Sequence, residues 1–236
     1  MRRGFVGAGV RHGRGLFRYG SVGLTLLALQ GCEETLSVVH PAGPAASAIA
    51  SLWRVLLIGA TLIFGFVAGL IAWGWRRPPG AVNERGFVIG LGFVFPVVVL
   101  LALLAYGLVI GERLLPRAAP EVVRVAAEGR QWAWRFSYED APERETENLL
   151  HIPAGRPVDV AITSVDVIHS FWVPRLAGKL DAVPGHVNTL RIEAYEPGRF
   201  AGLGAEFNGR GYRAHRFEVV AHEEAAWQAF LRGETP

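Results

Sequence analysis

Two segments of the C-terminal half contain the residue types that bind metal ions. His169 stands in the segment 167–174, VIHSFWVP, and His215 ends the segment 204–215, GAEFNGRGYRAH, which also contains Glu206. Imidazole nitrogens bind copper and zinc, so one hypothesis is a single copper or zinc ion held by the two histidines. The alternative is that both histidines are satisfied by hydrogen bonds in the protein interior.

The cysteine count limits this chemistry. The chain of 236 residues has one cysteine, Cys32. A disulfide within the chain is therefore excluded, as is any metal centre that needs two thiolates. The tetrapeptide 29–32, LQGC, resembles a bacterial lipobox, in which the cysteine is lipid-modified and becomes the mature N-terminus. The alternative is a free cysteine next to an ordinary signal peptide.

The first residues have the features of a secretory signal peptide. Residues 1–20 contain five arginines and no acidic residue, and a short apolar run follows from Val22 to Leu29. That run is too short to span a bilayer. We therefore expect 1–31 to be a signal peptide with a lipobox, and 32–51 to be an extracytoplasmic N-terminal segment.

Two later segments are long and apolar enough to cross a membrane. Val55–Trp75 has 21 residues and Gly86–Gly111 has 26, and neither segment contains a charge. About 20 helical residues cross a hydrocarbon core of ~30 Å, so 52–111 is predicted to form a two-helix transmembrane hairpin. Pro96 interrupts the second segment and predicts a kink there.

The charges predict the orientation of the hairpin. The loop 76–85 contains three arginines and one glutamate, which places it in the cytoplasm by the positive-inside rule. Both ends of the mature chain then lie outside. Residues 1–111 carry nine Arg or Lys against three acids, and 112–236 carry fifteen against eighteen. Because membrane orientation explains the basic half, nucleic acid is not expected as a partner.

The residues after 112 have the pattern of a β-domain. Short runs rich in Val, Ile and aromatic residues alternate with Pro-Gly and Asn-Gly turns, which favours a small β-sandwich or barrel. A helix is expected over 222–232. The predicted strands are 121–127, 131–138, 157–163, 187–195 and 215–220.

Three segments of this domain resemble subunit II of haem-copper respiratory oxidases, the family of cytochrome c oxidase and quinol oxidase subunit II. They are 131–138 (QWAWRFSY), 167–174, and 179–185 (KLDAVPG). The resemblance implies a membrane protein with two transmembrane helices and an all-β cupredoxin-like sandwich domain over 112–236. It also implies a multi-pass protein of the bacterial inner membrane, with the C-terminal domain on the extracytoplasmic side.

In copper-bearing members this domain holds the two-copper centre CuA. Glycine and asparagine stand here at the two bridging cysteine positions, tyrosine at the second histidine position, and histidine at the methionine position. A mixed-valence copper pair needs thiolate bridges, so CuA is predicted to be absent and no residue of the chain is expected to be catalytic. The six ligand positions implied by the resemblance are occupied by His169, Gly204, Glu206, Asn208, Tyr212 and His215, of which His169 is a remnant of a metal site.

Three further residues take roles from the resemblance. The carboxylate at the position of Glu206 reaches a magnesium ion shared with subunit I in the family, and one carboxylate is a normal protein share of such a site. Its alternative is a salt bridge. Trp132 corresponds to the tryptophan that passes electrons into CuA, and without CuA we expect it to serve in packing. Asp181 is expected to be structural, in the turn before 184–185.

The missing ligands favour the quinol-oxidising members of the family, which are often lipoproteins and receive electrons inside the membrane. The chain would be a non-catalytic subunit of a proton-translocating terminal oxidase. Subunit I, which carries the haems and copper, subunit III, membrane lipid and quinol would be its partners. The alternatives are a cytochrome c oxidase subunit II with an atypical electron route, a lipid-anchored assembly or metal-binding factor, and a degenerate paralogue with a regulatory role.

Overall fold

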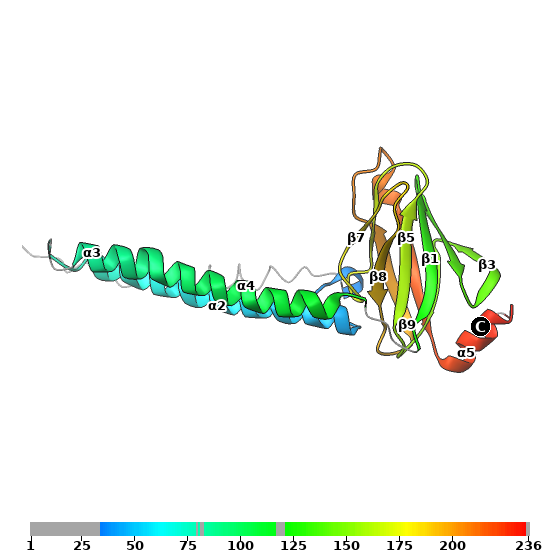
Figure 1. Cartoon of the computed structure of the whole chain (residues 1–236), viewed down its shortest axis with the longest axis horizontal. Coiled ribbons are helices and arrows are strands. Elements are labelled where there is room, and N and C mark those ends of the chain that lie inside the picture. The colour runs from blue at the N-terminus through cyan, green and yellow to red at the C-terminus, as the bar shows by residue number, and fades with distance from the viewer. Residues whose placement is uncertain (1–33, 79, 81–82, 117–120, 235–236) are drawn as a thin grey trace, which may run out of the picture. The chain divides into compact units, whose positions relative to one another are not determined.

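The computed structural model describes residues 34–78, 80, 83–116 and 121–234. This part of the chain consists of two long apolar helices, two β-sheets and a short C-terminal helix (Figure 1). The predicted signal peptide and lipobox, with Cys32, lie outside the described residues. The fold class predicted from the sequence, two apolar helices and a cupredoxin-like sandwich, is confirmed.

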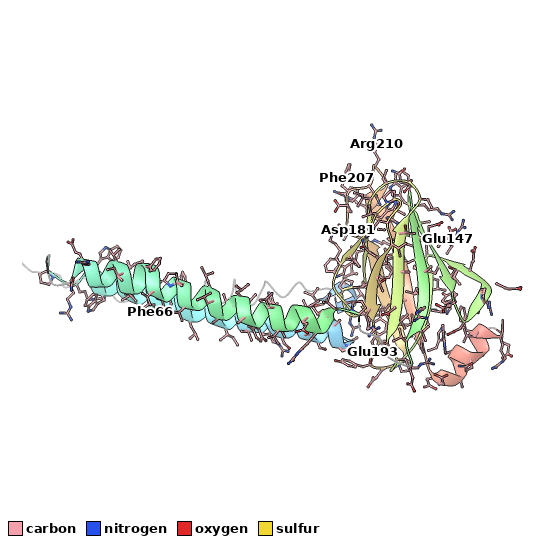
Figure 2. All side chains as sticks on the ribbon, viewed as in Figure 1. Phe66, Glu147, Asp181, Glu193, Phe207 and Arg210 are labelled. Atoms are coloured by element: carbon pink, nitrogen blue, oxygen red, sulfur yellow. The ribbon has the colours of Figure 1, made fainter. Side chains whose placement is uncertain are left out.

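The two apolar helices match the predicted hairpin in type and number. The first is α2 (Pro44–Gly74), and the second runs through α3 (Glu84–Phe87), η2 (Val88–Val94) and α4 (Phe95–Leu114). Their most apolar windows have mean hydropathies of 2.6 and 2.9 and are not buried within the chain. Both helices are therefore long and apolar enough to span a bilayer. Figure 2 shows their side chains projecting outward along the whole length.

Helix α2 begins at Pro44, before the boundary at 52 that the sequence predicted. Proline suits the first turn of a helix because its fixed φ is helical and its missing N–H would have no partner there. Ala46 and Ala50 are buried in these first turns. A search for apolar runs finds only the part of a helix that faces lipid. The first turns of α2 pack against protein and therefore lie outside the run.

The residues before α2 are tied to the sandwich by backbone hydrogen bonds. The N–H of Ala42 donates to the carbonyl of Arg175 at 2.7 Å, and the N–H of Tyr195 donates to the carbonyl of Ala42 at 2.9 Å. A Cβ on Gly43 would lie 2.0 Å from the carbonyl oxygen of Glu193. Only glycine permits so close an approach of two backbones.

A wide π turn precedes Pro96, where the sequence predicts a kink. Residues Val88–Val94 form this turn, and the N–H of Phe95 donates to the carbonyl of Gly90. Proline lacks an N–H, and its ring clashes with the carbonyl four residues earlier. A π turn widens the helix just before the proline, so the chain continues as a helix without a break.

The sandwich consists of two mixed five-stranded sheets. Their orders are β3-β2-β1-β5-β8 and β4-β10-β9-β6-β7, with β1 parallel to β5 and β4 parallel to β10. Inward-facing side chains of both sheets form the core. The strands are β1 (Val123–Arg130), β2 (Ala133–Tyr138), β3 (Ala141–Glu147), β4 (Leu149–Pro153), β5 (Val158–Ser164), β6 (His169–Trp172), β7 (Leu180–Ala182), β8 (Asn188–Ile192), β9 (Gly198–Gly204) and β10 (Arg216–His222).

The five predicted strands correspond to β1, β2, β5, β8 and β10, and five further strands carry no clear strand pattern. β3 is an edge strand rich in charge, and β6 and β7 are short. β9 contains three glycines, and one of them, Gly202, makes room for the ring of Phe217, which would lie 2.3 Å from an added Cβ. Glycine-rich and charged strands have low intrinsic strand propensity, so tertiary pairing decides their structure.

The expected C-terminal helix is α5 (Glu224–Leu231), and it covers a buried histidine pair. Nδ1 of His151 lies 2.7 Å from Nε2 of His222, and the ring of Phe230 stacks on His151 at 4.3 Å. Burial lowers the pKa of His151 to about 4, with further contributions from His222 and two nearby arginines. Burial and Arg199 also lower the pKa of His222.

This pair predicts loss of stability in mild acid. Because the folded pKa of His151 is depressed, the unfolded chain binds more protons between about pH 6.5 and about pH 4, and the free energy of unfolding should fall by on the order of 2 kcal/mol as pH falls through that window. Urea denaturation of the full chain in detergent, followed by tryptophan fluorescence, measures this dependence. His151→Phe keeps a stacked ring without the titrating group and should reduce the slope. The exposed His186→Gln serves as control, and an unchanged slope in His151→Phe would contradict the assignment.

Candidate functional site

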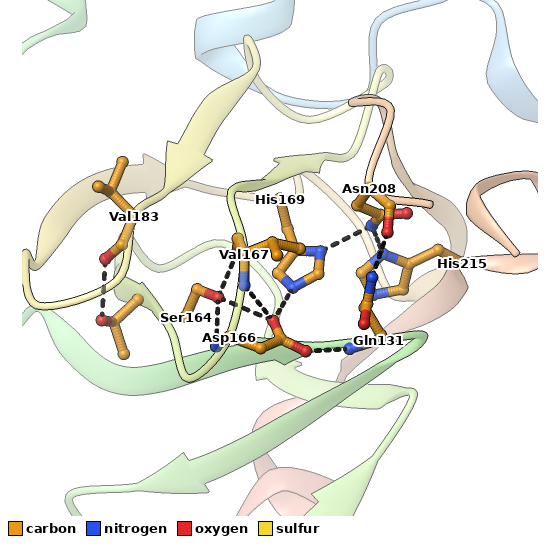
Figure 3. Close-up of polar contacts among 9 residues, drawn as sticks. Gln131, Ser164, Asp166, Val167, His169, Val183, Asn208 and His215 are labelled. Atoms are coloured by element: carbon orange, nitrogen blue, oxygen red, sulfur yellow. Dashed lines mark hydrogen bonds and ion pairs between the residues drawn. The ribbon is translucent and has the colours of Figure 1, made fainter. Parts of the chain in front are cut away.

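Two buried histidines face each other across an asparagine at one end of the sandwich. His169 begins β6, His215 follows η3 (Tyr212–Ala214), and Asn208 lies in the loop between β9 and η3. Nδ2 of Asn208 is 2.6 Å from Nδ1 of His169 and 2.8 Å from Nδ1 of His215 (Figure 3). The residues are 0%, 1% and 4% exposed for His169, His215 and Asn208. An amide nitrogen carries two hydrogens, so it can donate one to each ring.

Asp166 fixes the tautomer of His169. Its Oδ1 lies 2.7 Å from Nε2 of the ring and accepts the backbone N–H of Val167 at 2.6 Å, and its Oδ2 accepts the backbone N–H of Gln131 at 2.8 Å. Burial alone would raise the pKa of Asp166, but these hydrogen bonds outweigh it and lower the pKa to about 2. With an ionised carboxylate at Nε2, that nitrogen carries the hydrogen and Nδ1 is left as an acceptor. The group that faces Nδ1 must therefore be a donor.

The ring of His215 fills the space of a side chain at position 204. A Cβ on Gly204 would lie 2.6 Å from Nδ1 of His215, and the N–H of Gly204 donates to the carbonyl of His215 at 2.7 Å. The indole of Trp134 stacks on the same ring at 5.3 Å. Burial lowers the pKa of His215, and the neighbouring His169 adds to the effect. His215 is therefore held neutral, as an acceptor of the Asn208 amide.

Residues of the 131–138 segment hold the loop that carries Asn208. Nε2 of Gln131 donates to the backbone carbonyl of Asn208 at 2.6 Å. The ring of Trp132 lies against Gly211, where an added Cβ would be 2.4 Å from the indole. Trp132 is 41% exposed, so one face of its ring packs on the loop while the rest stays open. The loop is thus held by the Asn208 amide, which contacts both histidines, and by the contacts of Gln131 and Trp132 with its backbone.

Glu206 and Tyr212 point away from the histidines. The side chain of Glu206 is 44% exposed, with Oε2 3.9 Å from Nζ of Lys179, which is a weak surface contact. The ring of Tyr212 packs edge-on against Phe207, which together with Arg210 lies at the tip of the loop (Figure 2). Among the described residues, no three His, Cys, Asp or Glu side chains converge as metal ligands.

Asp181 lies in strand β7 rather than in the turn that the sequence predicted. Its Oδ1 accepts the hydroxyl of Ser170 at 2.6 Å and Nζ of Lys179 at 2.8 Å. Lys179 and Ser170 together lower the pKa of this carboxyl. The residue cross-links β7 to β6, which is a structural role. The sequence missed the strand because β7 has three residues and a charge in the middle.

The six positions do not fit a two-copper centre. Position 204 has no side chain, and the space beside it is taken by an imidazole. Asn208 offers hydrogens, not lone pairs, to the two histidines. Of the six residues, His169, Asn208 and His215 come together, whereas Glu206 and Tyr212 do not join them. Bridging thiolates are what a copper pair requires, and nothing at this site takes their place.

Two residues of the site carried no clear signal in the sequence. Asp166 stands three residues before His169 in a polar turn, and that spacing hints at a local hydrogen bond. Gln131 reaches Asn208 across 77 positions of the chain. Long-range contacts of a side-chain amide leave no periodic pattern, so only the folded chain reveals this one.

Comparisons with known proteins find relatives of this chain. Residues 142–221 match the family described as cytochrome c oxidase subunit II, periplasmic domain. Cytochrome c oxidase subunit 2 of Alkalihalophilus pseudofirmus is 32% identical over 89% of this chain and 66% of its own length. Quinol oxidase subunit 2 of Bacillus cereus is 29% identical over 88% of this chain, which spans 76% of that relative.

A solved structure is also similar to this chain. It is the periplasmic domain of subunit II of cytochrome oxidase from Bradyrhizobium japonicum, with 24% identity and a TM-score of 0.46. The match covers 50% of this chain and 96% of that domain.

The tight fit at position 204 predicts that even one added methyl group will disturb the site. Gly204→Ala should lower the free energy of unfolding by roughly 1–3 kcal/mol, because the His215 ring must leave its place beside Asn208. Gly198→Ala on the same strand is the control, since its Cβ would meet the nearest atom at an ordinary 3.7 Å. Urea denaturation of both full-length variants measures the difference. Equal stabilities would show that the ring is not confined as described.

Proposed function

Since this chain belongs to the subunit II family of haem-copper respiratory oxidases, we propose that it is subunit II of a quinol-oxidising terminal oxidase, and that its outer domain carries no electrons. The observation that supports this most is the Asn208 amide between His169 and His215. A domain without a copper relay has no use for a soluble electron donor. Quinol delivers electrons within the membrane, where such a relay is not needed.

The chain's own contribution in this proposal is structural. The two apolar helices would pack against subunit I, which holds the haems and copper in the family, with subunit III as a further partner. The outer domain would cover the extracytoplasmic face of subunit I in the bacterial inner membrane. Lipid modification at Cys32 would add a second anchor. The name of the Bacillus cereus relative, a quinol oxidase subunit, supports the choice of donor.

A second candidate is a cytochrome c oxidase subunit with another electron route. The partly exposed ring of Trp132 supports it, because this is the position from which the family's copper-bearing members take electrons. The ring packs on Gly211, beside a loop whose centre is Asn208. Among the described residues no group of three metal-ligating side chains lies behind it, so an electron on Trp132 has no metal acceptor in that part of the chain. The quinol proposal is therefore preferred.

Oxygen uptake by the purified complex tests the electron donor. The complex should be isolated through a tag on this chain and supplied either with quinol or with reduced cytochrome c. We expect uptake with quinol alone, and a copper content that matches subunit I without the two further atoms of CuA. Turnover with cytochrome c at a comparable rate would reject the proposal.

A separate measurement tests Glu206 as a ligand of a shared magnesium ion. Its side chain is 44% exposed, with Oε2 only 3.9 Å from Nζ of Lys179 and Oε1 accepting the backbone N–H of Phe207 at 3.0 Å. Part of the carboxylate can therefore meet a partner chain. Glu206→Gln should lower the magnesium or manganese content of the isolated complex while the complex still assembles. Glu196→Gln, at another exposed acid of the same domain, is the matched control. Unchanged metal content and assembly in Glu206→Gln would show that Glu206 is not a ligand of this ion.

A further inference from the structure

We propose that Asn208 keeps this pocket free of metal by engaging both histidine lone pairs, and that replacing its amide uncovers a site for one zinc or copper ion. This inference concerns side chains of this chain alone and does not depend on the electron donor. It assigns Asn208 the role of a residue that excludes metal from a place where imidazoles would otherwise bind it.

The pocket already aims two imidazole nitrogens at one point. The Nδ1 atoms of His169 and His215 converge on a single atom, at 2.6 and 2.8 Å. Zinc and copper sit about 2.0–2.1 Å from imidazole nitrogens, so small ring movements would bring both rings into bonding range of one ion. Neutral imidazole is the form that binds metal ions.

Asp166 already does what a supporting carboxylate does around a metal-bound histidine. Its Oδ1 accepts the hydrogen on Nε2 of His169, at 2.7 Å between the two heavy atoms, and this orients the ring. Backbone N–H groups of Gln131 and Val167 fix the carboxylate in turn. His169 is therefore aimed at the pocket centre whether or not an ion is there.

The amide is what prevents an ion from using this arrangement. Its two hydrogens occupy the two lone pairs, and a protonated amide nitrogen is not a metal ligand. Rotating the amide by half a turn would point Oδ1 at two acceptor nitrogens, which is unfavourable without a cation between them. The loop cannot simply swing aside, because Gln131 holds the Asn208 carbonyl and Trp132 packs on Gly211.

The Asn208 amide is not fully satisfied by its surroundings, which favours its replacement by a group that binds a metal ion. Oδ1 of Asn208 is buried without a hydrogen-bond partner in the described part of the chain. A buried polar atom without a partner costs stability. The amide therefore satisfies the two Nδ1 atoms while its own Oδ1 stays unpaired. A carboxylate at position 208 would instead offer a lone pair to a metal ion.

The test compares the wild type with Asn208→Asp and Asn208→Ala, as full chains in detergent. Each protein is purified without an oligohistidine tag, stripped with chelator, incubated with zinc or copper salt and passed through a desalting column before metal analysis. We expect no retained metal above background in the wild type. Asn208→Asp should retain about one zinc per chain, with affinity raised on the order of 100-fold and a higher unfolding temperature when zinc is present.

Two double variants locate the ion. Asn208→Asp combined with His169→Ala or with His215→Ala should lose the retained metal. Metal bound instead at the pair of His151 and His222 would be retained in both double variants, so the two sites are distinguished. If Asn208→Asp does not fold, Asn208→Ala gives the decision, because it opens the same two lone pairs without adding charge. One ion retained by the wild type and lost with His215→Ala would overturn the proposal. Folded Asn208 variants that retain no metal would overturn it as well.

Discussion

The amide of Asn208 is the contact on which the loop end of the sandwich depends. It lies where three segments meet: the start of β6 at His169, the approach to β10 at His215, and the loop that carries Glu206. Without a donor between them, two buried lone pairs would face one another, at a cost of about 1–3 kcal/mol for each unsatisfied atom. One side chain with two hydrogens satisfies both and joins the segments.

A chain of hydrogen bonds extends this cross-link from the rim of the domain to its core. It runs from the backbone of Gln131 through Asp166 and His169 to Asn208 and His215 (Figure 3). Each member fixes the orientation of the next, because an ionised carboxylate selects one tautomer and that tautomer selects a donor. Trp134 then stacks on the last ring and connects the site to the hydrophobic core.

This arrangement explains how a domain of a copper-binding family keeps its shape without the ligands for copper. A metal centre ties several loops together through strong, directional bonds, and its loss would ordinarily leave those loops without support. Here the hydrogen-bonded bridge replaces that support, and the His215 ring fills the volume beside Gly204.

The sequence by itself determined the class of this protein: apolar runs longer than a bilayer requires, the turn pattern of a sandwich and three family segments. It also determined that thiolate-bridged copper is excluded, since one cysteine cannot make two bridges. Helix α2 beginning at Pro44 and the glycine-rich β9 were decided by packing and pairing, which periodicity does not record. The tertiary structure alone decided that Asn208 joins His169 and His215, because a hydrogen-bond network depends on the positions of atoms brought together from distant parts of the chain.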